Sequence, residues 1–475
     1  MRPRSVAVAF GGLVVVILGI AAMVTVLVSG TLQQRFQPPP AAGSSSSSAS
    51  STLRGAQTAD AAPTPIQSTP LPVLAAAAPA GPPNPSKVRA RIDAVNDAAV
   101  GARFSGTVLD VGTGQVLYGH RASSPAIPAS TMKLLTSLAA LSILGPDHEF
   151  STTVVSPGAG ELVLVGGGDP YLASKKNAAY PERASLADLA AATAAQLKQA
   201  GQKTVALSYD ASLFPGPAWN PGWPRSYSDQ VTAVSALWAD EGRTTGASPG
   251  PRQADPAKAA GTTFAAALKQ RGIRVSTVRA GRAKPADRRI AAVPSMPLSR
   301  IVEQLLLVSD NDAAEVVFRQ AAIGAGRPGS LVEARSTVRE ALVTAGAWAE
   351  GTVVFDGSGL SRSTRVPAST MAKALRLAAD EQHPELRSVL TGLPVAGVEG
   401  SLRNRFTDSL SDAGIGLVHG KTGTLRQVHS LAGVVRAPDG SLMVFAFLVN
   451  NARNDYAATV WLDRVTSALS RCGCR

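Results

Sequence analysis

The chain has 475 residues, of which 45% are hydrophobic and 17% are charged, and its formal net charge is +13. This hydrophobic content is enough for a sizeable buried core and excludes a wholly disordered chain. The two cysteines, Cys472 and Cys474, are too few for a disulfide framework or a four-ligand zinc site, and five scattered histidines argue against a His-based metal cluster. The positive charge leaves nucleic acid, an anionic surface or an acidic polymer open as partners.

The first segment is apolar. Residues 6–28 carry no charge and follow Arg2 and Arg4. As a helix they would span roughly 35 Å, enough to cross a hydrocarbon core of about 30 Å. A cleaved signal peptide would have a shorter apolar region and a clear small-residue cleavage site, which Val28-Ser29-Gly30 matches poorly. We therefore expect residues 1–30 to be a transmembrane signal-anchor with a cytoplasmic N-terminus, and a cleaved signal peptide is the alternative.

The next segment, residues 31–87, is rich in Pro, Ala, Ser and Gly and lacks apolar periodicity. Such a composition predicts a disordered linker that holds a folded part away from the membrane. Five basic residues and one acidic residue precede residue 88, which leaves a net charge of +9 on the rest of the chain. Because that part contains no dense Lys/Arg run and is expected outside the cytoplasm, we expect no nucleic acid partner.

Hydrophobic patterns in the folded part predict two strand hairpins and several helices. The expected strands are residues 104–110, 115–119, 429–436 and 442–449, and the expected helices are residues 130–144, 298–308, 312–322 and 454–470. A hairpin near each end of the chain predicts one antiparallel sheet assembled from both ends. Residues 151–291 differ, with many Gly and Pro, a short strand at 161–165 and loop-like residues 226–252, and are expected to form an inserted module.

Three short motifs could carry chemistry, and the first is S-x-x-K. It places Ser130 and Lys133 at positions i and i+3 of the predicted helix 130–144, so that the amine can reach the hydroxyl. A lysine whose pKa is lowered by burial can serve as the base that activates a serine nucleophile. Taken alone, the motif is expected about once by chance in a chain of this composition.

The second and third motifs are S-x-N and K-T-G. Ser309-Asp310-Asn311 lies between two predicted helices, where a serine can relay a proton and an asparagine can hold a peptide group. The alternative is that Ser309 or Asp310 only caps the next helix. Lys421-Thr422-Gly423-Thr424 follows a strand-like segment at 416–419 and supplies a cation, two hydroxyls and a glycine. Its alternative is an edge strand protected by a lysine.

In this order and context, the three motifs resemble those of the penicillin-recognising serine enzymes. Three further segments, Gly166–Pro170, Asp356–Arg362 and Leu393–Arg403, resemble class C low-molecular-mass penicillin-binding proteins. These are D-alanyl-D-alanine carboxypeptidases of peptidoglycan, and some are also endopeptidases. The resemblance covers roughly residues 88–465, and the long gap between Ser130 and Ser309 fits the insertion of that family.

The resemblance implies an α+β fold, a penicillin-recognising serine transpeptidase/β-lactamase-like domain in which helices flank an antiparallel sheet. An inserted, mainly β-containing module accompanies this domain. The expected division is a penicillin-binding catalytic domain of residues 88–150 and 292–475 and an inserted domain of residues 151–291.

The resemblance also implies the catalytic roles. Ser130 would attack the carbonyl between two D-alanines, Lys133 would accept its proton, and Ser309 would pass a proton to the leaving amine. No metal or organic cofactor has a role, because the nucleophile and the base are side chains.

The same resemblance implies the substrate-binding residues. Asn311 would orient the substrate amide. Lys421, Thr422 and Thr424 would hold the terminal carboxylate, and Gly423 would allow the substrate backbone to approach. The backbone N–H groups of Ser130 and Thr424 would form an oxyanion hole.

A second sequence, P-A-S-T-M-A-K, echoes the first motif at Ser369 and Lys373. Its lysine is one position later, so we favour Ser130 and expect Ser369 to be a helix cap. Two other functions stay open at this point: a serine β-lactamase, which shares the motifs, and a non-catalytic wall-binding protein with a relic site. The large insertion and the D-G-S-G segment favour the peptidase.

The partners that follow are peptidoglycan stem peptides ending in D-Ala-D-Ala, β-lactam antibiotics as covalent inhibitors, and the membrane through the N-terminal anchor. The expected location is the extracytoplasmic face of a bacterial cell envelope, either anchored in the cytoplasmic membrane or secreted.

Overall fold

The structure is a computed structural model, and it describes residues 82–95, 97–100, 103–176 and 182–474. The expected signal-anchor at 1–30 and most of the expected linker lie outside these residues. Among the described helices, none combines the length and apolar character needed to cross a bilayer. Helix α2 (Pro85–Asp93) begins inside the last residues of the expected linker.

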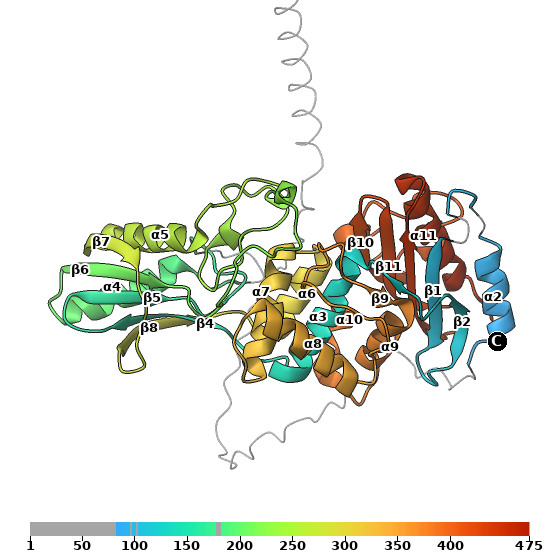
Figure 1. Ribbon diagram of the computed structural model, residues 1–475, viewed down its shortest axis with the longest axis horizontal. Helices are drawn as coiled ribbons and strands as arrows, with labels where there is room; N and C mark the ends of the chain where they lie inside the picture. Colours follow the sequence, from blue (N-terminus) through green and yellow to red (C-terminus); the bar gives the residue numbers. More distant parts are fainter. Residues whose placement is uncertain (1–81, 96, 101–102, 177–181, 475) are drawn as a thin grey trace, which may run out of the picture. The chain divides into compact units, whose positions relative to one another are not determined.

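A five-stranded antiparallel sheet is the centre of the first part of the fold (Figure 1). Its strand order is β10-β11-β12-β1-β2. The strands are β10 (Val418–Leu425), β11 (Val428–Arg436), β12 (Leu442–Asn450), β1 (Phe104–Asp110) and β2 (Val116–His120). Strand β1 pairs with β12 along its whole length, from Phe104 opposite Val449 to Asp110 opposite Met443. The prediction of one sheet built from both ends of the chain is therefore confirmed.

Both faces of this sheet are buried because side chains alternate along each strand. On β12, Val444, Ala446 and Leu448 pack into one core with the central helices. Their neighbours Phe445 and Phe447 pack into a second core with α2 and the closing helix α11 (Asp455–Ser470). Cys472 and Cys474 form a disulfide beside this second core.

The helices of the first core surround α3 (Met132–Leu144), which is buried at every residue from Met132 to Leu141. The helix that was predicted over residues 130–144 thus begins as a 3-10 turn, η1 (Ala129–Thr131), and continues as α3. The surrounding helices are α6 (Leu298–Leu307), α7 (Asn311–Gly324), α8 (Leu331–Thr344), α9 (Ala368–Ala378) and α10 (Ser388–Thr391). Two short strands, β3 (Pro125–Ala126) and β9 (Val366–Pro367), pair beside them.

A second five-stranded sheet is formed by residues between α3 and α6. Its order is β7-β6-β5-β4-β8, with β5, β6 and β7 parallel and the other pairs antiparallel. The strands are β4 (Ser151–Ser156), β5 (Glu161–Val165), β6 (Thr204–Asp210), β7 (Arg274–Ala280) and β8 (Arg288–Pro294). Strand β8 extends past residue 291, where the sequence placed the end of the insertion.

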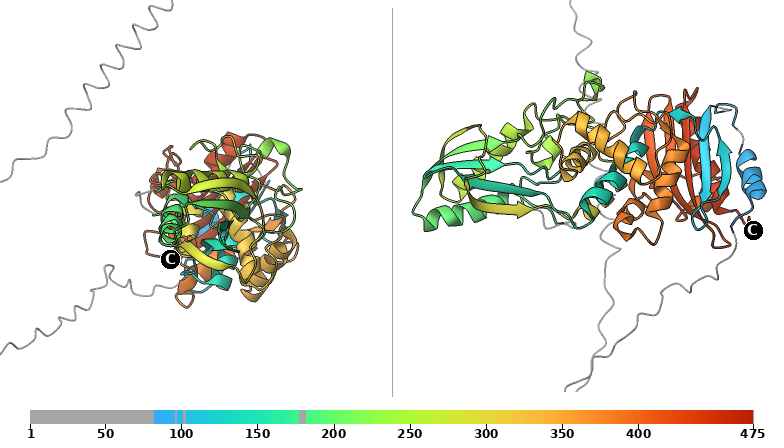
Figure 2. Two further views of the ribbon diagram at one scale, coloured as in Figure 1. Left: turned by 90° about the vertical axis from the view of Figure 1, so that its left-hand side faces the viewer. Right: turned by 60° about the horizontal axis from the view of Figure 1, so that its bottom comes forward.

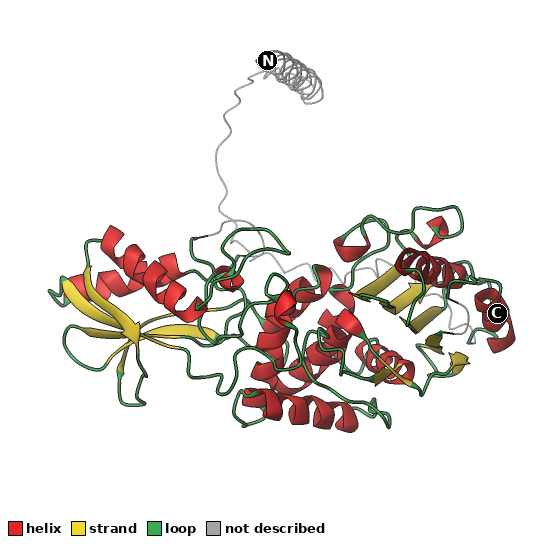
Figure 3. Cartoon of the chain, turned by 45° about the horizontal axis from the view of Figure 1, so that its top comes forward, coloured by secondary structure: helices red, strands yellow, loops and turns green. Residues whose placement is uncertain are grey.

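Two long helices, α4 (Leu186–Gln199) and α5 (Pro256–Gln270), accompany this sheet, so the segment is less purely β than the sequence suggested. Both helices share one apolar core with the sheet and lie on the same side of it (Figures 2 and 3). Single 3-10 turns complete the described elements. They are η2 (Arg225–Tyr227), η3 (Asp240–Gly242), η4 (Pro384–Leu386), η5 (Gly400–Leu402) and η6 (Asp412–Gly414).

Candidate active site

The S-x-x-K motif lies where the chain enters α3. Ala129 has a positive φ of 48°, a conformation that costs energy for a residue with a Cβ and is found mostly at functional sites. One helical turn separates Ser130 from Lys133, and the Nζ of Lys133 donates to the Oγ of Ser130 at 2.8 Å. The expected contact between nucleophile and base is present in the structure.

Lys133 is completely buried, and its ammonium group has three hydrogen-bond partners. Besides Ser130, its Nζ donates to Asn311 Oδ1 at 2.7 Å and to the carbonyl of Ser358 at 2.9 Å. Burial lowers the pKa of Lys133 to about 8, although the negative charge of Asp310 opposes the shift. At neutral pH a usable fraction of this lysine is therefore uncharged and able to accept a proton.

The S-x-N motif occupies the turn between α6 and α7. Ser309 has a positive φ of 60°. Asp310 is the N-cap of α7, and its side chain accepts from the N–H of Ala313 at 3.1 Å, so the capping interpretation is correct for this residue. Asn311 contacts Lys133 through its Oδ1 and donates through its Nδ2 to the carbonyl of Gln230 at 3.0 Å. By fixing the start of α7, this cap places Ser309 beside Lys421 and Asn311 beside Lys133.

The K-T-G motif lies inside β10, which begins at Val418 and includes all four motif residues. Lys421 is completely buried, and its Nζ donates to Ser309 Oγ and to the carbonyl of Thr422, both at 2.8 Å. Burial holds the pKa of Lys421 well below its usual value, and the nearby charge of Lys133 adds to the shift. The hydroxyl of Thr422 contacts that of Ser401 at 2.8 Å.

Gly423 allows β10 to lie directly against the loop that carries Ser130. A Cβ at this position would be 2.6 Å from the carbonyl oxygen of Pro128 and 3.1 Å from the Cβ of Ala129. The exposed Thr424 follows it on the strand. All the residues that the sequence predicted for the site thus lie in one region. Hydrogen bonds from Lys133 to Asn311 and from Lys421 to Ser309 connect the three motifs.

The D-G-S-G segment has a supporting role that the sequence did not reveal. Glu315 Oε1 accepts from the N–H groups of Gly357 and Ser358 at 2.9 and 2.8 Å, which fixes the Ser358 carbonyl beside Lys133. Asp356 is fully buried and accepts from Trp223 Nε1 at 2.8 Å. Glu315 and Trp223 therefore hold the segment from outside, and the segment in turn positions Lys133 through the Ser358 carbonyl.

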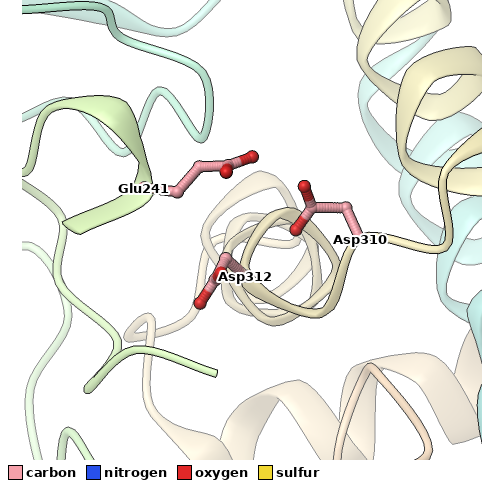
Figure 4. Close-up of side chains that lie close together, drawn as sticks. All are labelled: Glu241, Asp310 and Asp312. Carbon is pink, nitrogen blue, oxygen red and sulfur yellow. The ribbon is translucent and has the colours of Figure 1, made fainter. Parts of the chain in front are cut away.

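A cluster of buried charges lies behind the S-x-N turn. Carboxyl oxygens of Glu241, Asp310 and Asp312 lie within 4.8 Å of one another (Figure 4). Arg243 contacts all three and pairs with the carboxylates of Asp310 and Asp312, and Arg252 pairs with Asp312 at 3.3 Å. Burial and the adjacent Asp310 raise the pKa of Glu241 to about 10, so this side chain is protonated at neutral pH. Two arginines already supply the positive charge that a metal ion would bring. Nothing in the sequence marked this cluster.

Glu241 and Asp310 of this cluster line a cavity of about 620 Å³. Ser309, Asn311, Tyr171 and Arg183 also line this cavity. The space beside the S-x-N turn is large enough for part of a peptide substrate.

The second S-T-M sequence has another structural position. Helix α9 begins at Ala368 with Pro367 as its N-cap, and no side chain caps it. The expectation that Ser369 is a helix cap is therefore wrong, since Ser369 is the second residue of the helix and its N–H donates to the carbonyl of Ala122. Lys373 is exposed.

The sequence profile of the D-Ala-D-Ala carboxypeptidase 3 (S13) family matches residues 88–249 and 246–466. The chain belongs to this family. It is 34% identical over 430 residues to a carboxypeptidase of Mycobacterium tuberculosis, covering 84% of this chain and 90% of the relative. It is 29% identical over 476 residues to a D-alanyl-D-alanine carboxypeptidase of Actinomadura sp., covering 81% of this chain and 85% of the relative.

Among solved structures, penicillin binding protein 4 of Haemophilus influenzae matches with a TM-score of 0.65. The match covers 82% of this chain and all of that one, at 21% sequence identity. The expected fold class, a penicillin-recognising α+β fold with an insertion, is confirmed.

Proposed function

We propose that the protein is a serine D-Ala-D-Ala carboxypeptidase that releases the terminal D-alanine of peptidoglycan stem peptides through an acyl-enzyme on Ser130. The observation that carries this proposal is the hydrogen bond from the buried Lys133 to Ser130 Oγ at 2.8 Å. Membership of the D-Ala-D-Ala carboxypeptidase family supports the reaction, and relatives with the same activity in their names cover most of the chain.

In the first step, the Oγ of Ser130 attacks the carbonyl carbon between the two D-alanines, and its proton passes to the uncharged Nζ of Lys133. The new C–O bond turns the carbonyl oxygen into an oxyanion, which the backbone N–H groups of Ser130 and Thr424 stabilise. Such a donor is worth roughly 3–4 kcal/mol in comparable enzymes. Burial supports the role of Lys133, because it lowers the pKa to about 8.

In the second step the C–N bond breaks, and the leaving amine of D-alanine takes a proton from Ser309. Ser309 is resupplied by Lys421, to which it is hydrogen-bonded at 2.8 Å. Before deacylation, Lys133 releases to solvent the proton that it took from Ser130, and Lys421 takes one up. A water molecule then attacks the acyl carbonyl, Lys133 accepts its proton, and this proton passes to Ser130 Oγ as the acyl C–O bond breaks, which frees Ser130 for the next cycle.

The substrate is held by the remaining motif residues. Lys421, Thr422 and Thr424 bind the terminal carboxylate, which favours the charged form of the lysine and offsets the cost of its burial. Gly423 lets the substrate backbone lie along β10 as an added strand. Asn311 orients the substrate amide, in a position fixed by Lys133 and Gln230.

The same geometry makes β-lactam antibiotics covalent inhibitors, because their strained amide carbonyl can be attacked by Ser130. A structure of Haemophilus influenzae penicillin binding protein 4 is described as a complex with a β-lactam, which supports this part of the proposal. Endopeptidase activity on cross-linked peptides would use the same nucleophile.

We further propose that residues 88–150 and 292–475 form the catalytic domain and that residues 151–291 form an inserted one, with strand β8 continuing to Pro294. The apolar core between the second sheet and helices α4 and α5 supports this division. An N-terminal anchor at residues 1–30 would hold the enzyme at the outer face of the cytoplasmic membrane.

The decisive test is to incubate the protein with a pentapeptide ending in two D-alanines and to assay free D-alanine. We expect release by the wild-type protein and none by Ser130→Ala. A lack of release by the wild-type protein would contradict the function and favour a wall-binding role. The lifetime of a penicillin adduct separates a penicillin-binding protein, whose adduct lasts for hours, from a β-lactamase, whose adduct turns over quickly.

A further inference from the structure

One face of the second sheet carries arginines at both edges. The Cα pairing aligns five residues in a row across the sheet: Arg279 on β7, Ser208 on β6, Val163 on β5, Val155 on β4 and Arg289 on β8. With neighbouring strands about 4.8 Å apart, the two arginines begin roughly 19 Å from each other. The three residues between them are small or β-branched.

This row lies on the side of the sheet opposite helices α4 and α5. Leu162, Leu164, Val154 and Leu207 pack into the core that contains the two helices. Side chains alternate along a strand, and directly paired residues share a face, so the neighbours of these residues, and the arginines paired with them, point the other way. The side free of α4 and α5 can be followed in Figure 3.

The connection from β7 to β8 passes over this face and adds two more basic residues. It begins where the N–H of Gly281 donates to the carbonyl of Tyr209 at 3.0 Å, and that of Ala283 donates to Asp210 Oδ2 at 2.8 Å. Because β7 and β8 are the two edges of the sheet, residues 281–287 must cross it. Arg282 and Lys284 on this connection are exposed.

We define the basic face as Arg274, Arg279, Arg282, Lys284 and Arg289. Arg274 pairs with Thr204 and shares its orientation, opposite to that of the buried Val205. All five side chains are exposed, and none forms an ion pair within the described part of the chain.

Three acidic residues accompany the five basic ones, and the buried Asp210, which accepts from the N–H of Ala283, is one of them. Glu161 shares the orientation of the basic face at the start of β5, and Asp287 accepts from the N–H of Lys284 at 2.8 Å. Residues 274–289 contain no aromatic side chain, so the face lacks the apolar anchor that proteins use to enter a bilayer surface. A polymer with repeated negative charges fits this surface better than a membrane does.

We propose that the basic face binds the peptidoglycan polymer through the carboxylates of its peptides, at a distance from the bond that is cleaved. This inference rests on the proposed function, because it makes the polymer both substrate and support. Each exposed ion pair contributes little binding free energy, but the contributions of several pairs along one polymer add up. Together they keep further stem peptides near the catalytic serine. Binding of this kind weakens as salt is raised.

The test is co-sedimentation of the full chain with purified peptidoglycan sacculi. The Ser130→Ala background removes turnover from the measurement. We expect the double variant Arg279→Gln/Arg289→Gln to bind about five- to tenfold more weakly, because two charge interactions between arginine and the carboxylates of the polymer are lost together. The matched control is Arg436→Gln/Arg453→Gln, which removes the same charge from exposed arginines elsewhere and should bind as the parent does.

Three further results decide the proposal. Arg279→Lys/Arg289→Lys should keep the parent's binding, and an equal loss in this variant would mean that the residues act structurally and would overturn it. Unchanged binding by the Gln variant, or stronger binding to anionic lipid vesicles than to sacculi, would also overturn it. Release of D-alanine from a soluble pentapeptide by protein with an intact Ser130 should be the same with and without the Gln substitutions. Failure of the wild-type protein in that assay would contradict the proposed function instead.

Discussion

Gly359 packs against the main chain of Ala129, the residue before Ser130. Gly359 has a φ of 80°, and a Cβ at this position would overlap the carbonyl oxygen of Ala129 and come within 3.0 Å of the Cβ of Met132. Ala129 itself has a positive φ. The D-G-S-G segment and the nucleophile loop therefore fit together as two main chains in direct contact, with no room for a side chain between them.

Replacing Gly359 with Ala should displace Ser130 and lower the rate of acylation by a penicillin by about 100-fold, since a misplacement near 1 Å has such an effect. The rate can be followed with a fluorescent penicillin. Gly326→Ala is the matched control, because Gly326 has a similar φ of 74° but nothing within 4 Å of an added Cβ. Equal rates in the two variants would show that the close contact does not position Ser130.

Ser130→Ala should abolish covalent labelling by the fluorescent penicillin while the protein keeps its melting temperature, because Lys133, which donates to Ser130, keeps its other two acceptors. Labelled protein on a denaturing gel is the measurement. Ser369→Ala should label as the wild type does. Persisting label on Ser130→Ala would place the nucleophile elsewhere.

The acylation rate should depend on pH through Lys133. Its pKa is lowered to about 8, so the uncharged base is a minority below that pH and the majority above it. We expect the rate to rise about tenfold per pH unit between pH 6 and 7.5 and to level off above pH 8. Lys373→Met, which alters an exposed lysine, should keep the same profile. A rate that does not change between pH 6 and 9 would exclude Lys133 as the base.

Glu241 should make the protein less stable as pH rises. Its folded-state pKa is raised from 4.5 to about 10, so the folded state holds a proton that the unfolded state releases above pH 4.5. The free energy of unfolding then falls from about pH 4.5 towards pH 10. Glu241→Gln, which mimics the protonated form, should remove this slope and stabilise the protein by several kcal/mol at pH 8.

Melting temperatures between pH 5 and 9 would measure this effect. The control is Glu340→Gln, whose side chain is 60% exposed and should leave the pH dependence unchanged. Parallel curves for the wild type and Glu241→Gln would show that Glu241 is ionised in the folded protein.

Sequence patterns predicted the elements that carry the motifs, because a helix or strand with one buried face repeats its apolar residues at a regular spacing. Residues 104–110 form the predicted strand, and the helices around Ser309 begin and end within a few residues of their expected positions. The K-T-G strand was placed too early, since Gly420 and Gly423 interrupt the apolar pattern that normally marks a strand. Those glycines are needed for close packing.

The partners of the motif side chains could not be predicted from the sequence. The acceptors at Ser358 and Gln230 are backbone carbonyls, which any residue type provides. Glu241 meets Asp310 only through folding of a distant segment, and neither residue carries a motif that announces the other. Short-range patterns identify reactive side chains, whereas the groups that tune them depend on tertiary packing.

The pairing of β1 with β12 links catalysis to the completion of the polypeptide. Strands β1 and β2 leave the ribosome early, yet β1 finds its second neighbour only after residues 442–450 have been made. Strand β12 joins β11 to β1, so until it is made the β10–β11 hairpin that carries Lys421 is not joined to the rest of the sheet. A partly synthesised chain therefore carries an unreactive Ser130, and a product that stops before β12 would have an open sheet edge and no assembled active site.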